Sequence, residues 1–154
     1  SWKRYAGNPL FVYAAFRTWF GNYDHKTAAF AVHYQDGTVM NDGFFTICQK
    51  TDPYTYLGRR PLHLNRGTSL ETGLGVTTLK SMGFTTIVSA AFSALGTGGH
   101  LRRSNKVDQR VDIDRLTLVG HRPFPYQLDG DYIGEIERLE LRYEPDCLDL
   151  ILPV

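Results

Sequence analysis

The feature that most constrains this chain is the alternation of apolar with polar or charged side chains in its C-terminal half. Residues 107–113 and 139–143 show it clearly, and Leu116 and Leu118 continue it. A period of two places successive side chains on opposite faces of a β-strand, so each segment reads as a half-buried strand. The pattern predicts a mainly β fold with antiparallel sheets.

Three earlier segments, residues 27–33, 44–49 and 73–79, also have strand character, because they are rich in aromatic and β-branched residues or alternate in polarity. Asp-Gly pairs stand at 36–37 and 42–43, and Asp-Gly is a strong hairpin signal. We therefore expect an antiparallel meander through the first two segments.

Two helices are predicted among the strands. From Phe84 to Leu95, apolar residues recur at i, i+3, i+4, i+7, i+8 and i+11, which makes one stripe of an amphipathic helix over residues 82–95. Ser81 can cap this helix, and the glycines of residues 96–99 end it. Residues 9–20 begin at an Asn-Pro pair, a typical helix start, and form the other predicted helix.

The 154 residues correspond to one domain, and neither a repeat nor a linker divides them. Fifteen glycines and seven prolines indicate many turns, and residues 51–66 are expected to form an irregular loop or an edge segment. The fold class is therefore predicted to be an antiparallel β-sandwich with two inserted helices.

Several functional classes are disfavoured by composition. The formal net charge of +1 argues against dedicated nucleic-acid binding, and the apolar runs are too short to cross a membrane. Cys48 and Cys147 are interpreted as two reduced core thiols. The Arg59-Arg60 and Arg102-Arg103 pairs are first interpreted as solvated loop charges, although they can also attract anionic lipid.

One stretch, residues 127–135, carries three acidic residues around a tight glycine turn. Composition alone favours a plain Asp-Gly hairpin turn. A carboxylate on a rigid, exposed turn is also suited to act as a general base.

That stretch resembles the C-terminal half of bacterial diacylglycerol kinases, a family related to sphingosine kinases and, more distantly, NAD kinases. The matching motifs are Leu128-Asp129-Gly130-Asp131, a Pro145–Pro153 ending, residues 51–58, residues 69–74 and Gly98-Gly99-His100. The order and spacing agree over nearly the whole chain, and the actinobacterial members look most similar.

The resemblance implies that residues 1–154 are the C-terminal, lipid-binding and base-carrying domain of an ATP-dependent lipid kinase. The N-terminal domain of that family carries a G-G-D-G-T loop for ATP, which this sequence lacks. The chain starts without Met, so we expect it to be part of a longer protein. The resemblance also implies a diacylglycerol-like substrate, Mg²⁺, no nucleic acid, a cytoplasmic location and peripheral contact with the inner face of the membrane. Its own N-terminal kinase domain is the implied partner, and a homodimer is left open.

Site residues follow from the same resemblance. Asp131 takes the position of the family's proton acceptor, usually Glu, and Asp129 would orient the turn or bind a Mg²⁺-linked water. A structural Mg²⁺ would be bound by the carbonyl of Ser69, the side chain of Thr72 and the carbonyl of Leu74. Thr72 replaces the family's Asp, so this site is expected to be weak or empty. Another departure lies around Lys50, where the Asn common before the first loop is replaced. Glu135 is a competing candidate for the base.

Three alternatives remain: a non-catalytic β-sandwich that binds lipid or protein, a sphingosine-kinase-like fragment, and an NAD-kinase-like fragment. A G-G-D-G-T loop encoded upstream of Ser1 would favour an enzyme over the binding module. Assays of the full-length protein against diacylglycerol, sphingosine and NAD would separate the three enzymes.

Overall fold

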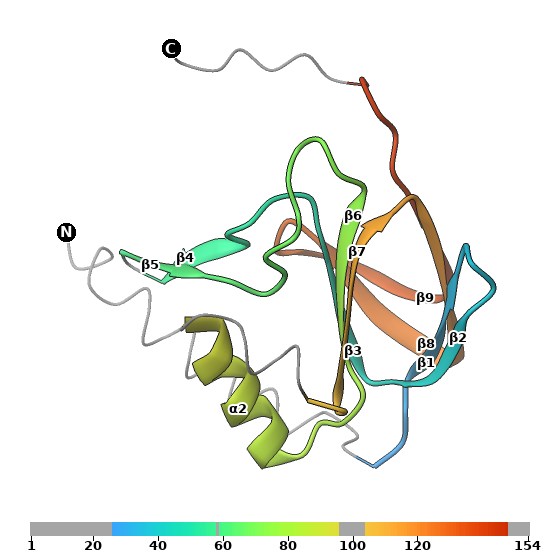
Figure 1. Ribbon diagram of the computed structural model, residues 1–154. Coiled ribbons are helices and arrows are strands. Elements are labelled where there is room, and N and C mark those ends of the chain that lie inside the picture. The colour runs from blue at the N-terminus through green and yellow to red at the C-terminus, as the bar shows by residue number, and fades with distance from the viewer. Residues whose placement is uncertain (1–25, 58, 96–103, 148–154) are drawn as a thin grey trace.

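The computed structural model describes residues 26–57, 59–95 and 104–147 (Figure 1). The predicted helix over residues 9–20 lies outside these ranges. The described elements, in chain order, are β1 (Phe30–Tyr34), β2 (Val39–Gly43), β3 (Phe45–Gln49), β4 (Thr55–Leu57), β5 (Arg60–Leu62), β6 (Leu74–Leu79), α2 (Phe84–Leu95), β7 (Val107–Ile113), β8 (Arg115–Leu128) and β9 (Asp131–Arg142).

Two antiparallel sheets enclose the core, which confirms the predicted mainly β, sandwich-like fold. One sheet has the strand order β2-β1-β8-β9 and the other has the order β3-β6-β7. Side chains from both sheets form one buried cluster, as alternating strand patterns require. The cluster consists of Phe30, Val32, Tyr34, Met40, Leu116, Leu118 and Phe124 from the first sheet and Val76 and Ile113 from the second.

The two Asp-Gly pairs behave differently. Gly37 has φ 81° and turns the chain from β1 into β2, and the carboxylate of Asp36 accepts a hydrogen bond from the Thr38 amide at 2.8 Å. The expected meander is wrong at the second pair, because β3 pairs with β6 instead of β2. A Cβ on Gly43 would lie 2.5 Å from the Phe30 ring, so glycine is needed for close packing while the chain crosses between the sheets.

The segment expected to be irregular, residues 51–66, contains the β4–β5 hairpin, which pairs Thr55 with Leu62 and Leu57 with Arg60. This hairpin projects from the two larger sheets on the side of α2, and α2 contacts β5.

The helix predicted over residues 82–95 is confirmed as α2. The Ser81 hydroxyl accepts a hydrogen bond from the Gly83 amide, and the Gly83 carbonyl accepts from Thr86 and Ile87. Ser81 therefore shapes the turn that leads into the helix. α2 has 12 residues, and the described part of the chain contains no helix that is both long and apolar enough to cross a membrane.

Candidate functional site

The Asp129–Gly130 turn lies at the tip of the β8–β9 hairpin. Asp129 has φ 51° and Gly130 has φ 93°, and Leu128 pairs directly with Asp131 across the turn. Two central residues with positive φ make the hairpin turn that follows the twist of the strands, and Asp and Gly are the residues that tolerate it. The Asp-Gly turn predicted from the sequence is therefore present, and it fixes the start of β9 at Asp131.

The two candidate bases, Asp131 and Glu135, lie on opposite faces of this hairpin. Residues directly opposite in an antiparallel pair share a face, and faces alternate along each strand. Asp131 is opposite Leu128, which shares the face of Phe124, a buried core residue. Glu135 is opposite Pro125 and faces the other way. Asp131 therefore lies on the same face of the hairpin as Phe124, the face that packs against the core further along the sheet.

A bulge in β9 causes this separation. Tyr126 pairs with Gly134 while Gln127 pairs with Tyr132, so Ile133 is an extra residue on β9, and Gly134 has φ 146°. Residues four apart on a regular strand would share a face. A glycine in strand context is the one local pattern that indicates this bulge.

The tip is exposed and partly apolar. The exposed fractions of Leu128, Tyr132 and Ile133 are 66%, 68% and 53%. Within the part of the chain that the structure describes, the carboxylates of Asp129 and Asp131 have no hydrogen-bond or ion-pair partner. Chemically, this tip presents free carboxylates beside apolar contact surface. Such a carboxylate is able to accept a proton from a group brought against it.

Two of the three predicted Mg²⁺ ligands, Ser69 and Thr72, lie together in the loop before β6, and their predicted ligand atoms already hydrogen-bond to each other. The Thr72 hydroxyl donates to the Ser69 carbonyl at 3.1 Å and accepts from the Ser69 amide at 2.9 Å. The ammonium group of Lys50 donates to the Thr72 carbonyl. Leu74 lies in β6, where it pairs with Ile113.

This donor set does not fit a divalent cation. Mg²⁺ prefers carboxylate oxygens, and Thr72 supplies a neutral hydroxyl next to a lysine ammonium. Glu71 is exposed, and its carboxylate accepts a hydrogen bond from the Ser69 hydroxyl at 2.8 Å, which lowers the pKa of Glu71. No group of three or more His, Cys, Asp or Glu side chains able to hold a metal ion occurs in the described ranges.

Sequence reasoning missed a hydrogen-bonded pair, His63 and Asp52, at the base of the β4–β5 hairpin. His63 Nδ1 lies 2.9 Å from the carboxylate of Asp52, and both side chains are largely buried, with 18% and 14% exposed. The two residues flank the hairpin, so a predicted hairpin at 55–62 would have brought them close. We interpret this pair as a structural link that anchors the projecting hairpin.

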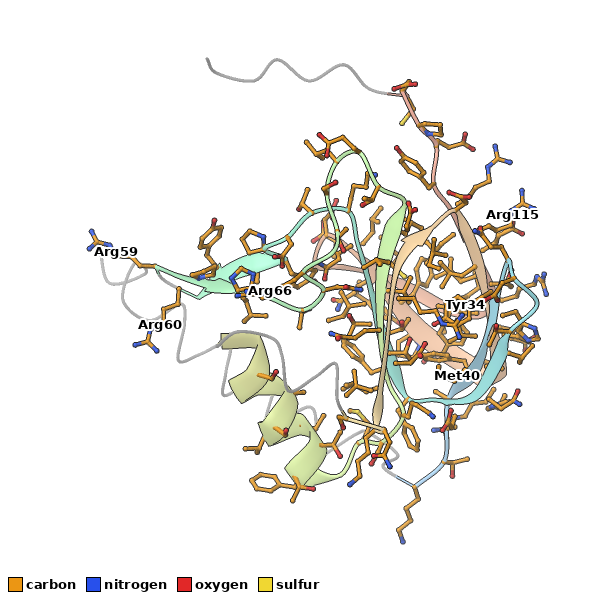
Figure 2. The ribbon with its side chains drawn as sticks, viewed as in Figure 1. Tyr34, Met40, Arg59, Arg60, Arg66 and Arg115 are labelled. Carbon is orange, nitrogen blue, oxygen red and sulfur yellow. The ribbon has the colours of Figure 1, made fainter. Side chains whose placement is uncertain are left out.

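The remaining sequence candidates are placed as follows. Arg59 and Arg60 are exposed at the turn of the β4–β5 hairpin, at the opposite end of the molecule from Arg115 (Figure 2). The pair Arg102-Arg103 lies outside the described residues.

Burial raises the pKa of the Cys48 thiol to about 12, so Cys48 stays protonated and unreactive at neutral pH.

Comparisons with known proteins support the fold. No family model matches the chain, and no curated protein matches it. A crystal structure of a putative diacylglycerol kinase from Bacillus anthracis str. Sterne is similar, with a TM-score of 0.52 and 18% sequence identity. The similarity covers 88% of this chain and 47% of the Bacillus chain, so the chain spans about half the length of that protein. At this identity the similarity shows that the two chains share a fold.

Proposed function

We propose that this chain is the lipid-binding, base-carrying C-terminal domain of an ATP-dependent kinase that phosphorylates the hydroxyl of diacylglycerol or a similar lipid. The observation that carries the proposal is the fold similarity over 88% of the chain to about half of a putative diacylglycerol kinase. The Leu128–Asp131 motif at the hairpin tip adds a candidate base. The actinobacterial resemblance belongs to this proposal as well.

In the proposed reaction, Asp131 accepts the proton of the lipid hydroxyl as that oxygen attacks the γ-phosphorus of ATP, and the bond from the γ-phosphorus to the β,γ-bridging oxygen breaks to release ADP. Phosphoryl transfer depends on alignment of the hydroxyl and on a positioned carboxylate. Asp131 is favoured over Glu135 because it lies on the core-facing side of the hairpin, whereas Glu135 lies on the opposite face. Asp129 would orient the turn. ATP and its Mg²⁺ would be bound by a separate N-terminal domain of the same protein.

The proposed substrate requires contact with a membrane surface. Tyr54 and Tyr56 on the β4–β5 hairpin have exposed fractions of 45% and 62%, and Arg59 and Arg60 are exposed next to them. Tyrosine favours the membrane–water interface, and arginine is attracted to anionic lipid. These features support this hairpin as a contact with anionic lipid, and in the proposal the enzyme is cytoplasmic and binds peripherally to the inner face of the membrane.

The test is a kinase assay on the full-length protein with diacylglycerol, sphingosine and NAD as acceptors. We expect phosphorylation of diacylglycerol, and we expect Asp131→Asn to lower its rate by about 10²–10⁴-fold, because an amide cannot accept the proton. Asp131→Glu should retain activity. Glu135→Gln is the matched control and should stay close to wild type.

The outcomes separate the candidate functions. Activity lost in Glu135→Gln and kept in Asp131→Asn would move the base to Glu135. Phosphorylation of sphingosine or NAD alone would change the substrate class. If the full-length protein has no ATP-binding domain and no kinase activity with any acceptor, the non-catalytic binding module replaces the kinase proposal.

A further inference from the structure

Lys50 lies at a junction between the two sheets. It directly follows β3, its ammonium group donates to the Thr72 carbonyl, and that nitrogen lies 3.8 Å from the centre of the Tyr143 ring. Thr72 belongs to the loop before β6, and Tyr143 follows β9 of the other sheet. One cation therefore bridges the 69–74 loop and the end of β9.

The surroundings of this nitrogen are those of a cation site. A carbonyl oxygen and the face of an aromatic ring both present negative potential to a positive charge. The carboxylate of Glu71 adds a negative charge on the same loop, and the electrostatic effect of Lys50 contributes to lowering the pKa of Glu71 after the Ser69 hydrogen bond. Lys50 is half-buried, and its ammonium group reaches both partners.

We propose that the ammonium group of Lys50 takes the place of a metal ion in this loop, so that the 69–74 loop is held in shape without a divalent cation. The Thr72 hydroxyl completes the arrangement, because it donates to the Ser69 carbonyl, which a cation would otherwise contact, and accepts from the Ser69 amide. A divalent metal site would need a carboxylate and oxygen atoms free to coordinate the ion. This loop has the neutral Thr72 instead, and the ammonium group of Lys50 lies against it. The contacts of Lys50 with Thr72 and Tyr143 lie within the chain, and they are independent of the kinase proposal.

The first experiment measures thermal unfolding of the protein in EDTA and in millimolar Mg²⁺. We expect the wild-type Tm to be the same in both. Lys50→Met keeps the stem and removes the charge, and we expect it to lower the Tm by about 2–8 °C. The matched control is Lys80→Met, because Lys80 pairs with the exposed Asp42 at 3.3 Å on the surface and should matter little.

The second experiment converts the loop into a metal site. Thr72→Asp combined with Lys50→Met supplies a carboxylate and removes the ammonium group, and the Tm of this double variant should rise when Mg²⁺ is added. Thr72→Asn with Lys50→Met has nearly the same shape without the charge and should not respond.

Three results would overturn the proposal: a wild-type Tm that rises with Mg²⁺, a Lys50→Met variant no less stable than Lys80→Met, or a folded Thr72→Asp, Lys50→Met variant that ignores Mg²⁺. If that double variant does not fold, the wild-type and single-variant measurements decide. A Mg²⁺ titration followed by NMR of the amides of residues 69–74 provides an independent readout, and we expect no shifts in the wild-type protein.

Discussion

Tyr34 links the two sheets through a single hydroxyl group. Its side chain is 5% exposed, and its hydroxyl donates to the carboxylate of Asp108 on β7 at 2.8 Å. The guanidinium of Arg110 lies 3.8 Å from the centre of the Tyr34 ring and also pairs with Asp108 at 3.4 Å. Burial, followed by the hydrogen bond to Asp108, raises the pKa of Tyr34 well above its ordinary value.

This raised pKa predicts a stability loss at alkaline pH. An unfolded tyrosine ionises near pH 10, whereas folded Tyr34 keeps its proton to higher pH. The unfolded state therefore binds fewer protons above about pH 10, and the free energy of unfolding falls as pH rises there, with the full contribution present below that pH. Tyr34→Phe should cost about 1 kcal/mol at pH 8 through the lost hydrogen bond and should show a shallower alkaline decline.

Urea unfolding at pH 8 and at pH 11 measures both effects. Cys48 adds its own alkaline decline, since its pKa is also raised, to about 12. Cys48→Ala is therefore the control, and it should keep the part of the decline that belongs to Tyr34. Equal losses in wild type and Tyr34→Phe between the two pH values would contradict the prediction.

Among the elements, the β4–β5 hairpin has the most unusual surface. Tyr54 and Tyr56 lie two residues apart in an extended segment, so their rings point to the same face. The turn beside them carries Arg59 and Arg60, and the buried Asp52–His63 pair closes the base of the hairpin. Aromatic and basic side chains are thus presented together on an element that projects from the sandwich (Figure 1).

We expect Arg59→Glu with Arg60→Glu to weaken binding of the full-length protein to vesicles that contain phosphatidylserine by more than about tenfold. Each basic residue near an anionic surface contributes about 1 kcal/mol, and the substitution also adds repulsion. Sedimentation with vesicles measures the effect.

The control is Arg115→Glu with Arg142→Glu, which changes the net charge by the same amount. These two residues pair across β8 and β9, and Arg115 lies at the opposite end of the molecule from the hairpin. Equal losses in both double variants would mean that net charge alone governs binding. Unchanged binding in Arg59→Glu, Arg60→Glu would make these arginines ordinary solvated charges.

Local patterns predicted those elements whose signal is contained within a few neighbouring residues. The stripe from Phe84 predicted α2, the alternation over residues 73–79 predicted β6, and Asp-Gly predicted the turns at Gly37 and Gly130. The crossing at Gly43 was not predictable in this way, because the glycine is required by Phe30, a partner in a different strand.

The candidate site also has features that local sequence patterns predict and features that depend on distant contacts. The turn that carries Asp129 and Asp131 could be identified from four adjacent residues. The bulge that turns Glu135 to the other face depends on pairing with β8. The contacts of Lys50 with Thr72 and Tyr143 join segments that are far apart in the sequence. Local patterns in a single sequence do not predict such long-range contacts.

At the scale of the whole molecule, the β8–β9 hairpin continues beyond its neighbours. β1 pairs with β8 only as far as Gly120, whereas β8 and β9 remain paired from Phe124 to the turn. The tip with its exposed Leu128 and Tyr132 therefore extends past the four-stranded part of the sheet. Under the proposed function, this extension would meet the ATP-binding domain.

We accordingly expect the 154-residue chain alone to bind no ATP and to phosphorylate no lipid. A glycine-rich phosphate loop of the Walker type or the G-G-D-G-T type is absent from its sequence. Isothermal titration with ATP and Mg²⁺, followed by a lipid kinase assay, checks this, with the full-length protein as the positive control. ATP turnover by the purified chain would contradict the division of roles.

The strand order has a consequence for how quickly this chain reaches its native state. β1 lies at the start of the described chain, yet its sheet closes only when Phe30 meets Gly120 and Tyr34 meets Leu116. The chain between β1 and β8 must lose the entropy of loop closure before the pairing of the two strands can lower the free energy. Because this pairing is long-range, we expect folding on the order of milliseconds to seconds, with the local β8–β9 hairpin forming before β1 docks.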